Sequence, residues 1–219
     1  MSYLEYNVAQ VPSGLRKVLH LNWALIVLIA AVVAIGVMQL YSVAGGSWRP
    51  WAEPQLKRFG LGLAAMFVIA MIPIWLWRNL SALLFAISIA LLLAVEFVGV
   101  VGMGAQRWID LGFMRLQPSE LTKITLVMML AAYYDWLPPA KASRPIWVII
   151  PVALILLPVM LTLMQPDLGT AILLLAGGGA MMFFAGVHWA YFATVIAAGV
   201  GLVTTVLQSK GTSWQILKD

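Results

Sequence analysis

The sequence contains no cysteine, and only 10% of its 219 residues are charged. Without cysteine, neither a disulfide framework nor a thiolate metal site can form. The shortage of charge accompanies 63% hydrophobic residues and a mean hydropathy of +0.98, values that a soluble globular domain does not tolerate. The net charge of +5 is small for a nucleic-acid-binding protein, so we expect no nucleic-acid partner. An anionic lipid surface or an anionic amphiphilic substrate suits this charge better.

Apolar runs close to the ~20 residues that a helix needs to cross a bilayer recur along the chain. They predict an all-α, polytopic membrane protein with about seven transmembrane helices. The predicted spans are 22–42, 58–77, 80–101, 118–136, 145–164, 168–186 and 189–207. The transmembrane domain then covers residues 22–207, between a polar N-terminal segment, 1–21, and a short tail, 208–219. The very short connection at Arg78-Asn79 predicts that the helices on either side are antiparallel neighbours.

Polar residues concentrate in two segments of this otherwise apolar chain. The first, Gly104–Lys123, contains the runs GAQRWIDLG and QPSELTK, and the second, Gln165–Thr170, reads QPDLGT. The order of the predicted spans places both segments on one face of the membrane, each opening an inbound helix. Proline suits the first helical position, so we expect Glu120 and Asp167 in first turns, where the helix dipole favours a carboxylate.

The distribution of basic residues leaves the orientation open. Seven of them fall on the face that carries the two motif segments: Arg49, Lys57, Arg58, Arg107, Arg115, Lys210 and Lys218. The positive-inside rule weakly predicts that this face is cytoplasmic, whereas the pair Arg16-Lys17 before the first span argues the reverse. The alternative is that the motif face is external and that its positive charge holds an anion.

Several motif residues have both a structural and a functional interpretation. Glu120 and Lys123 share a helix face, where they either neutralise each other and pin neighbouring helices or line a polar cavity. Asp167 is either a helix-start acid or a participant in chemistry. Arg107 offers a planar fork to phosphate oxygens. Trp108 either stacks on a sugar or anchors the loop at the membrane interface.

The three motifs, in this order and spacing, resemble the shape, elongation, division and sporulation (SEDS) family, from the first span to about Gln208. The sequence of Gln165–Thr170 and the short N-terminal segment resemble the RodA branch of the family more than the FtsW branch. The resemblance implies a peptidoglycan glycosyltransferase that polymerises lipid II during cell elongation. It further implies the outer face of the bacterial cytoplasmic membrane, a cytoplasmic N-terminus and a class B penicillin-binding protein as partner.

The resemblance also implies roles for individual residues. The expected substrate-binding residues are Arg107, Trp108, Arg115 and Asp167, and the expected supporting residues are Glu120, Lys123, Gln117 and Gln165. Among these, Glu120 and Lys123 match the buried acid-base pair of the family. The family has about ten spans, and its catalytic aspartate lies in a large external loop. Because this chain reaches only the start of that loop, at Asp219, we expect no catalytic base in it and no activity from it alone. We expect no metal site and no cofactor, while assistance by a divalent cation stays open.

Two other classes of function fit the same sequence. Polar residues inside spans and helices that start at Gln-Pro-acid segments also suit a lipid flippase or transporter. Transporters usually consist of paired halves, whereas the two segments here are otherwise dissimilar, which weakens that reading. A non-catalytic scaffold that recruits a penicillin-binding protein is the third possibility.

Overall fold

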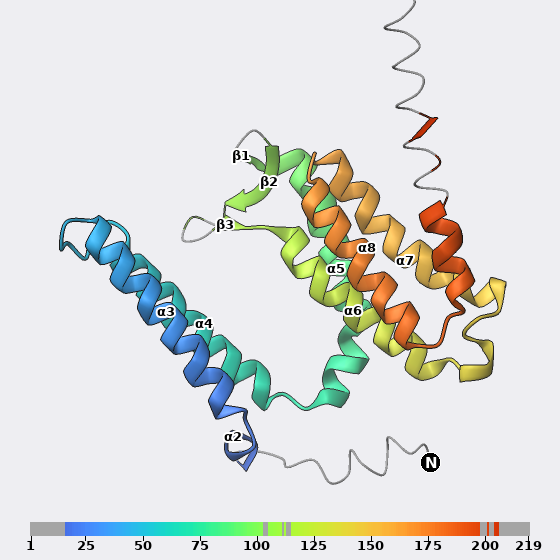
Figure 1. Cartoon of the computed structure of the whole chain (residues 1–219), viewed down its shortest axis with the longest axis horizontal. Helices are drawn as coiled ribbons and strands as arrows, with labels where there is room; N and C mark the ends of the chain where they lie inside the picture. Colours follow the sequence, from blue (N-terminus) through green and yellow to red (C-terminus); the bar gives the residue numbers. More distant parts are fainter. Residues whose placement is uncertain are drawn as a thin grey trace, which may run out of the picture. The chain divides into compact units, whose positions relative to one another are not determined.

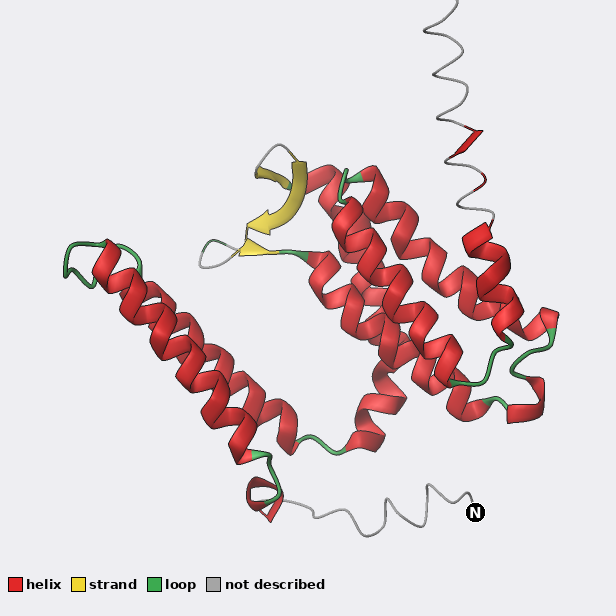
Figure 2. Ribbon diagram, viewed as in Figure 1, coloured by secondary structure: helices red, strands yellow, loops and turns green. Residues whose placement is uncertain are grey.

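A computed structural model describes residues 16–102, 105–110, 112, 115–197, 201, 204 and 205. The chain divides into two compact units, Met1–Trp77 and Arg78–Asp219 (Figure 1). Helices dominate both units, and the second also contains short strands (Figure 2). The predicted helical, polytopic class is confirmed, but the small sheet was not predicted. Residues 1–15 of the predicted N-terminal segment, and the predicted tail 208–219, lie outside the described residues.

The first unit is a helical hairpin preceded by a short helix, α2 (Arg16–Leu19). Helix α3 (Trp23–Val43) begins after Asn22, whose side chain accepts a hydrogen bond from the Leu25 amide at 3.1 Å. Helix α4 (Ala52–Met71) runs back alongside it (Figure 1). The ammonium of Lys17 donates to the carbonyl oxygens of Met71 and Ile72, which the end of α4 leaves without helical partners. Helix α2 and the α3–α4 loop therefore lie at opposite ends of the hairpin, as predicted.

The predicted boundaries of the second and third spans were wrong. Helix α4 begins at Ala52 rather than 58, and α5 (Ile74–Val98) begins before the predicted connection at Arg78. Hydropathy missed the first turns of α4 because they are charged, yet Glu53 pairs there with Arg49 at 3.0 Å and Lys57 at 2.7 Å along the helix face. The helices separate at Ile72-Pro73, because a proline ends the preceding helix. A proline signal was thus present in the sequence.

The second unit is a bundle in which α8 packs against both α6 and α7 (Figure 1). Helices α6 (Pro118–Trp136) and α7 (Pro145–Met164) have the predicted bounds, and each begins at a proline. Helix α8 (Leu168–Phe184) ends two residues before its prediction, and a 3-10 turn, η1 (Pro139–Lys141), joins α6 to α7. The last predicted span is helical over 189–197 and lies partly outside the described residues.

The core of the second unit is apolar, with hydroxyl groups that bond within it. Its buried members are Phe85, Leu126, Leu130, Val148, Ile155, Val159, Ala171, Leu174, Met182 and Val187. The hydroxyls of Ser88 on α5 and Thr125 on α6 share a buried hydrogen bond of 2.8 Å. Thr162 donates to the carbonyl of Pro158 at 2.7 Å, next to a proline that interrupts the bonding of α7.

The polar ends of the second unit differ from each other. At one end, Arg78 pairs with Asp135 at 3.0 Å, and Ser143 bonds to the chain at Gly186 and His188. At the other end lies an antiparallel sheet of β1 (Val100–Gly102), β2 (Ala105–Asp110) and β3 (Arg115–Leu116), in the order β1-β2-β3. Val100 pairs with Trp108, and an irregularity follows before Val101 pairs with Gln106. We call the end with the sheet the motif end.

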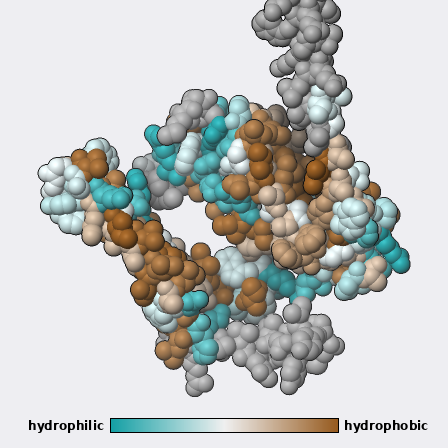
Figure 3. Space-filling model, viewed as in Figure 1, coloured by the Kyte–Doolittle hydropathy of each residue, from teal (hydrophilic) through white to brown (hydrophobic). Residues whose placement is uncertain are grey.

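The surface of the helices is that of a membrane protein. Helices α3, α5 and α7 are long and apolar enough to cross a bilayer, and α8 is a shorter apolar helix. Hydrophobic residues cover most of the visible length of the α3–α4 hairpin, whereas hydrophilic residues gather near the strands of the second unit (Figure 3). Because lipid replaces water around such helices, their apolar surfaces need no further protein cover.

Candidate functional site

The two motif segments meet at the motif end through Arg107. This residue lies on β2, and its Nε donates to the carbonyl oxygen of Gln165 at 3.2 Å. One terminal nitrogen donates to the carbonyl of Pro166, and the other lies 3.8 Å from Oδ2 of Asp167. The Arg107 side chain is 29% exposed and that of Asp167 only 11%, so the contact is largely shielded from solvent. Residues far apart in the sequence thus form one polar site, as the sorting of loops predicted.

Asp167 caps helix α8 in addition to facing Arg107. Its Oδ1 accepts from the Thr170 amide at 3.1 Å, and its Oδ2 accepts from the Thr170 hydroxyl at 2.9 Å. We expected Asp167 in the first turn, but it is the N-cap, and Pro166 lies before the helix. The aspartate side chain takes this position because it satisfies an amide that has no helical partner. An aspartate three residues before a threonine at a helix start is typical of an N-cap, and we did not use this pattern in the prediction.

Gln117 links the start of α6 to the same carboxylate. Its amide donates to Oδ2 of Asp167 at 3.4 Å and to the hydroxyl of Ser119 at 3.1 Å. Arg107, Gln117 and Asp167, which we call the motif cluster, therefore join β2, α6 and α8. Each of the three elements contributes one side chain, so the network connects them to one another.

Two glutamines attach the motif end to the last turns of α5. The buried amide of Gln165 donates to the carbonyl of Leu92 at 3.0 Å, and that of Gln106 donates to the carbonyl of Val95 at 3.0 Å. A Cβ at Gly99 would lie 2.8 Å from Cγ of Gln106 and 2.4 Å from the Val95 oxygen, so only glycine fits there. We predicted Gln165 as a supporting residue, but we did not predict the structural roles of Gln106 and Gly99.

Trp108 and Arg115 do not join the motif cluster. Trp108 follows Arg107 on β2 and is half-buried, and the pairing of β1 with β2 is irregular at this point, so the regular alternation of strand side chains does not apply. Arg115 lies opposite Asp110 across β2 and β3, with Nε 3.7 Å from the carboxylate and 62% of its side chain exposed. Arg115 therefore pairs with Asp110 rather than with the carboxylate that Arg107 faces.

Glu120 and Lys123 form the predicted pair on α6, but the pair is not buried. The ammonium of Lys123 lies 2.9 Å from Oε1 of Glu120, and Glu120 is in the first turn of α6, as predicted. The Glu120 side chain is 56% exposed and that of Lys123 is 28% exposed. The residues described here leave this pair partly exposed, and the expected burial stays a prediction. Among the described residues, no group of three His, Asp or Glu side chains could hold a metal ion.

The fold and the motif cluster define a class of protein. It is a polytopic helical membrane protein with a polar site, built around an arginine, at one end of a helix bundle. The sequence model of the FtsW/RodA/SpoVE family, described as "Cell cycle protein", matches residues 16–218. The chain therefore belongs to this family.

Relatives and solved structures agree with this assignment. The chain is 34% identical over 172 residues to "Peptidoglycan glycosyltransferase MrdB" of Escherichia coli K12, which covers 78% of this chain and 45% of MrdB. The crystal structure of the rod-shape-determining protein RodA of Thermus thermophilus matches with a TM-score of 0.71 and 32% identity, over 83% of this chain and 59% of RodA.

A chain from a solved peptidoglycan synthase complex, described as structurally coordinating polymerization and crosslinking, also matches. Its TM-score is 0.76 at 33% identity, over 86% of this chain and 55% of the other. The chain thus spans about half the length of the relatives that it matches.

Proposed function

We propose that this chain forms the lipid II-binding part of a peptidoglycan glycosyltransferase that extends glycan strands during cell elongation. The observation that carries the proposal is the bridge from Arg107 on β2 to Gln165, Pro166 and Asp167 at the start of α8. This bridge places a partly shielded arginine, with a carboxylate 3.8 Å away, at the end of an apolar bundle. Such a site suits an anionic lipid, whose pyrophosphate lies at the membrane boundary and whose tail lies along helices.

The chemistry assigns a limited role to this part of the protein. In the proposed reaction, the 4-hydroxyl of the acceptor loses its proton to an aspartate outside this chain and attacks the anomeric carbon of the donor strand. The bond to undecaprenyl pyrophosphate breaks, and the leaving group carries away the electron pair. Arg107 donates N–H groups to two backbone carbonyls. The remaining N–H donors of its guanidinium stabilise the negative charge of the leaving pyrophosphate.

The other named residues support this arrangement in different ways. Asp167 and Gln117 hold the guanidinium and the helix starts in place, and Gln165 ties them to α5. Trp108, next to Arg107 on β2, is placed to contact the saccharide or the membrane interface. Arg115 and the exposed Glu120–Lys123 pair are positioned to influence the approach of an anionic headgroup through their charge.

The proposal includes a cellular context. We place the protein in the bacterial cytoplasmic membrane with its N-terminus cytoplasmic and the motif end outside, where an anionic substrate explains the positive charge. A class B penicillin-binding protein is the proposed partner, and the match to a chain of a complex that coordinates polymerization and crosslinking supports this choice. The name of MrdB and the RodA structure support polymerisation in the elongation branch.

A polymerisation assay tests the proposal. Labelled lipid II is incubated in liposomes with the proposed partner and with either this chain or the same reading frame extended past Asp219. We expect polymer from the extended form only, and a loss of about 100-fold on Arg107→Ala, the size typical of removing one donor to a developing charge. Arg115→Ala, on the same sheet, is the matched control and should retain most of the activity.

The alternative functions appear as distinct outcomes of this experiment. Transfer of labelled lipid II across the liposome membrane without polymer would assign a flippase. Partner binding without polymer or transfer, in a correctly folded complex of the extended form, would assign a scaffold. Either result would overturn the proposed glycosyltransferase.

A further inference from the structure

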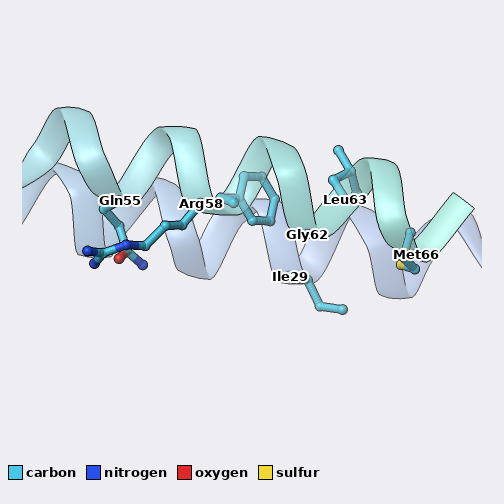
Figure 4. Close-up of a pocket in the computed structure, with 7 residues that line it drawn as sticks. Ile29, Gln55, Arg58, Gly62, Leu63 and Met66 are labelled. Atoms are coloured by element: carbon cyan, nitrogen blue, oxygen red, sulfur yellow. The ribbon is translucent and has the colours of Figure 1, made fainter. Parts of the chain in front are cut away.

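The α3–α4 hairpin carries a groove that the motif cluster does not use. Its volume is about 400 Å³, and it lies within the first unit. The residues that line it are Ile29 from α3 and Gln55, Arg58, Phe59, Gly62, Leu63 and Met66 from α4. Figure 4 shows Gln55 and Arg58 together at one end of the row, and Met66 at the other. The groove is therefore polar at one end and apolar along the rest of its length.

Arg58 differs from the other basic side chains described in this hairpin because it has no partner there. Arg49 and Lys57 both pair with Glu53, and Lys17 bonds to backbone carbonyls. The guanidinium of Arg58 forms no hydrogen bond or ion pair with any residue that the structure describes, although it lies more than one turn inside α4. Arg58 is exposed, so its guanidinium is available to an anionic headgroup at the polar end of the groove.

We propose that this groove binds one anionic phospholipid. The planar fork of Arg58 and the amide of Gln55 hold the headgroup phosphate, and one acyl chain follows Phe59, Leu63 and Met66. From Gln55 to Met66 the helix rises about 16 Å at ~1.5 Å per residue. This is about half of the ~30 Å hydrocarbon core, so the groove matches the depth of a single leaflet.

The donors at the polar end favour a membrane phospholipid over the proposed substrate. One guanidinium and one amide suit a single phosphate, whereas a pyrophosphate presents two phosphate groups to the same two donors. The groove lies in the first unit, and all residues of the motif cluster belong to the second. The proposal therefore does not depend on the glycosyltransferase assignment.

Native mass spectrometry of the full chain, released from nanodiscs, tests the proposal by counting bound lipids. The nanodiscs contain equal amounts of phosphatidylglycerol and a zwitterionic phospholipid with the same acyl chains. We expect one phosphatidylglycerol to be retained, and about tenfold less retention in Arg58→Gln, because a hydrogen bond to a charged group is lost. Lys57→Gln removes the neighbouring charge, which is already paired with Glu53, and should retain the lipid.

A second pair of variants tests the apolar part of the groove. A Cβ at Gly62 or at Gly60 meets no atom within 4 Å, so leucine is tolerated at either position and raises helix propensity equally. Gly62→Leu fills the groove and should reduce phosphatidylglycerol retention to the level of Arg58→Gln. Gly60→Leu, which does not line the groove, should leave retention unchanged, and equal thermal stability of the two variants excludes misfolding.

Three results would overturn the proposal. Equal losses in Arg58→Gln and Lys57→Gln would mean that the lipid responds to general surface charge. Equal retention of the zwitterionic lipid would mean that only apolar contact matters. Displacement of phosphatidylglycerol by an equal amount of lipid II would assign the groove to the substrate.

Discussion

Replacing Arg107 by alanine should destabilise the second unit far more than the same change at Arg115. The substitution removes a donor to the Gln165 carbonyl at 3.2 Å and a second donor to Pro166, and it leaves the 11%-exposed Asp167 without its cation. Hydrogen bonds to charged groups contribute about 1.5–3 kcal/mol each, although neighbouring bonds are not additive. Solvent reaches part of the arginine, so we expect a loss of about 2–4 kcal/mol in the free energy of unfolding.

Arg115 provides the matched control for this prediction. It also belongs to the sheet and also faces an aspartate, but the distance to Asp110 is 3.7 Å and 62% of its side chain is exposed. Exposed pairs of this kind contribute about 0–1 kcal/mol. Arg115→Ala should therefore change the free energy of unfolding by less than about 0.5 kcal/mol.

Unfolding titrations with sodium dodecyl sulfate in mixed micelles measure both variants on one scale. A double-mutant cycle of Arg107→Ala with Asp167→Asn isolates the interaction between the two side chains, because asparagine keeps an oxygen that caps α8. We expect a coupling energy above about 0.5 kcal/mol. Equal losses at Arg107 and Arg115, or additive effects in the cycle, would refute the reasoning that the motif cluster holds the sheet on the helices.

Two predictions concern packing inside the second unit. A Cβ at Gly178 would lie 2.5 Å from Cγ1 of Ile155, so Gly178→Ala should cost about 1–3 kcal/mol in the same titration, whereas Gly177→Ala, with its nearest contact at 4.0 Å, should not destabilise. A stable Gly178→Ala would show that α7 and α8 are not in close contact there. Ser88→Ala combined with Thr125→Val should reveal a coupling of about 0.6 kcal/mol, since hydroxyl bonds between membrane helices average that value. A coupling near zero would contradict the hydrogen bond between α5 and α6.

The helices that begin at a proline were predictable to the residue. Pro118 and Pro145 mark the starts of α6 and α7 because proline lacks the N–H that the first turn leaves unpaired. The boundary between α4 and α5 was missed because a hydropathy window discounts the charged first turns of α4, where the side chains neutralise one another. Pro73 indicates the correct boundary between the two helices, because proline disfavours helix continuation, but averaged hydropathy does not detect it.

The strands were harder to predict than the helices. The run from Ala105 to Asp110 is short and mixes apolar, aromatic and charged residues, so its pattern alone does not separate a strand from a loop. The strand forms because β1 lies beside it and because Gln106 reaches Val95 across the space that Gly99 leaves free. These contacts join residues on α5, β1 and β2 that come together only when the chain turns back after α5, so a local sequence pattern does not reveal them.

The sequence by itself determined the helical membrane class, the two motif segments, their location on one face and the ion pair of Glu120 with Lys123, because these follow from hydropathy and helix spacing. Only the tertiary structure decided which polar residues meet. It placed Arg107 on the carbonyls of Gln165 and Pro166 and left Arg115 exposed, although the two arginines look equivalent in sequence. The physical reason is that the partners of Arg107 are backbone oxygens and a capping carboxylate at the turn between α7 and α8. Their positions follow from helix packing rather than from any local pattern.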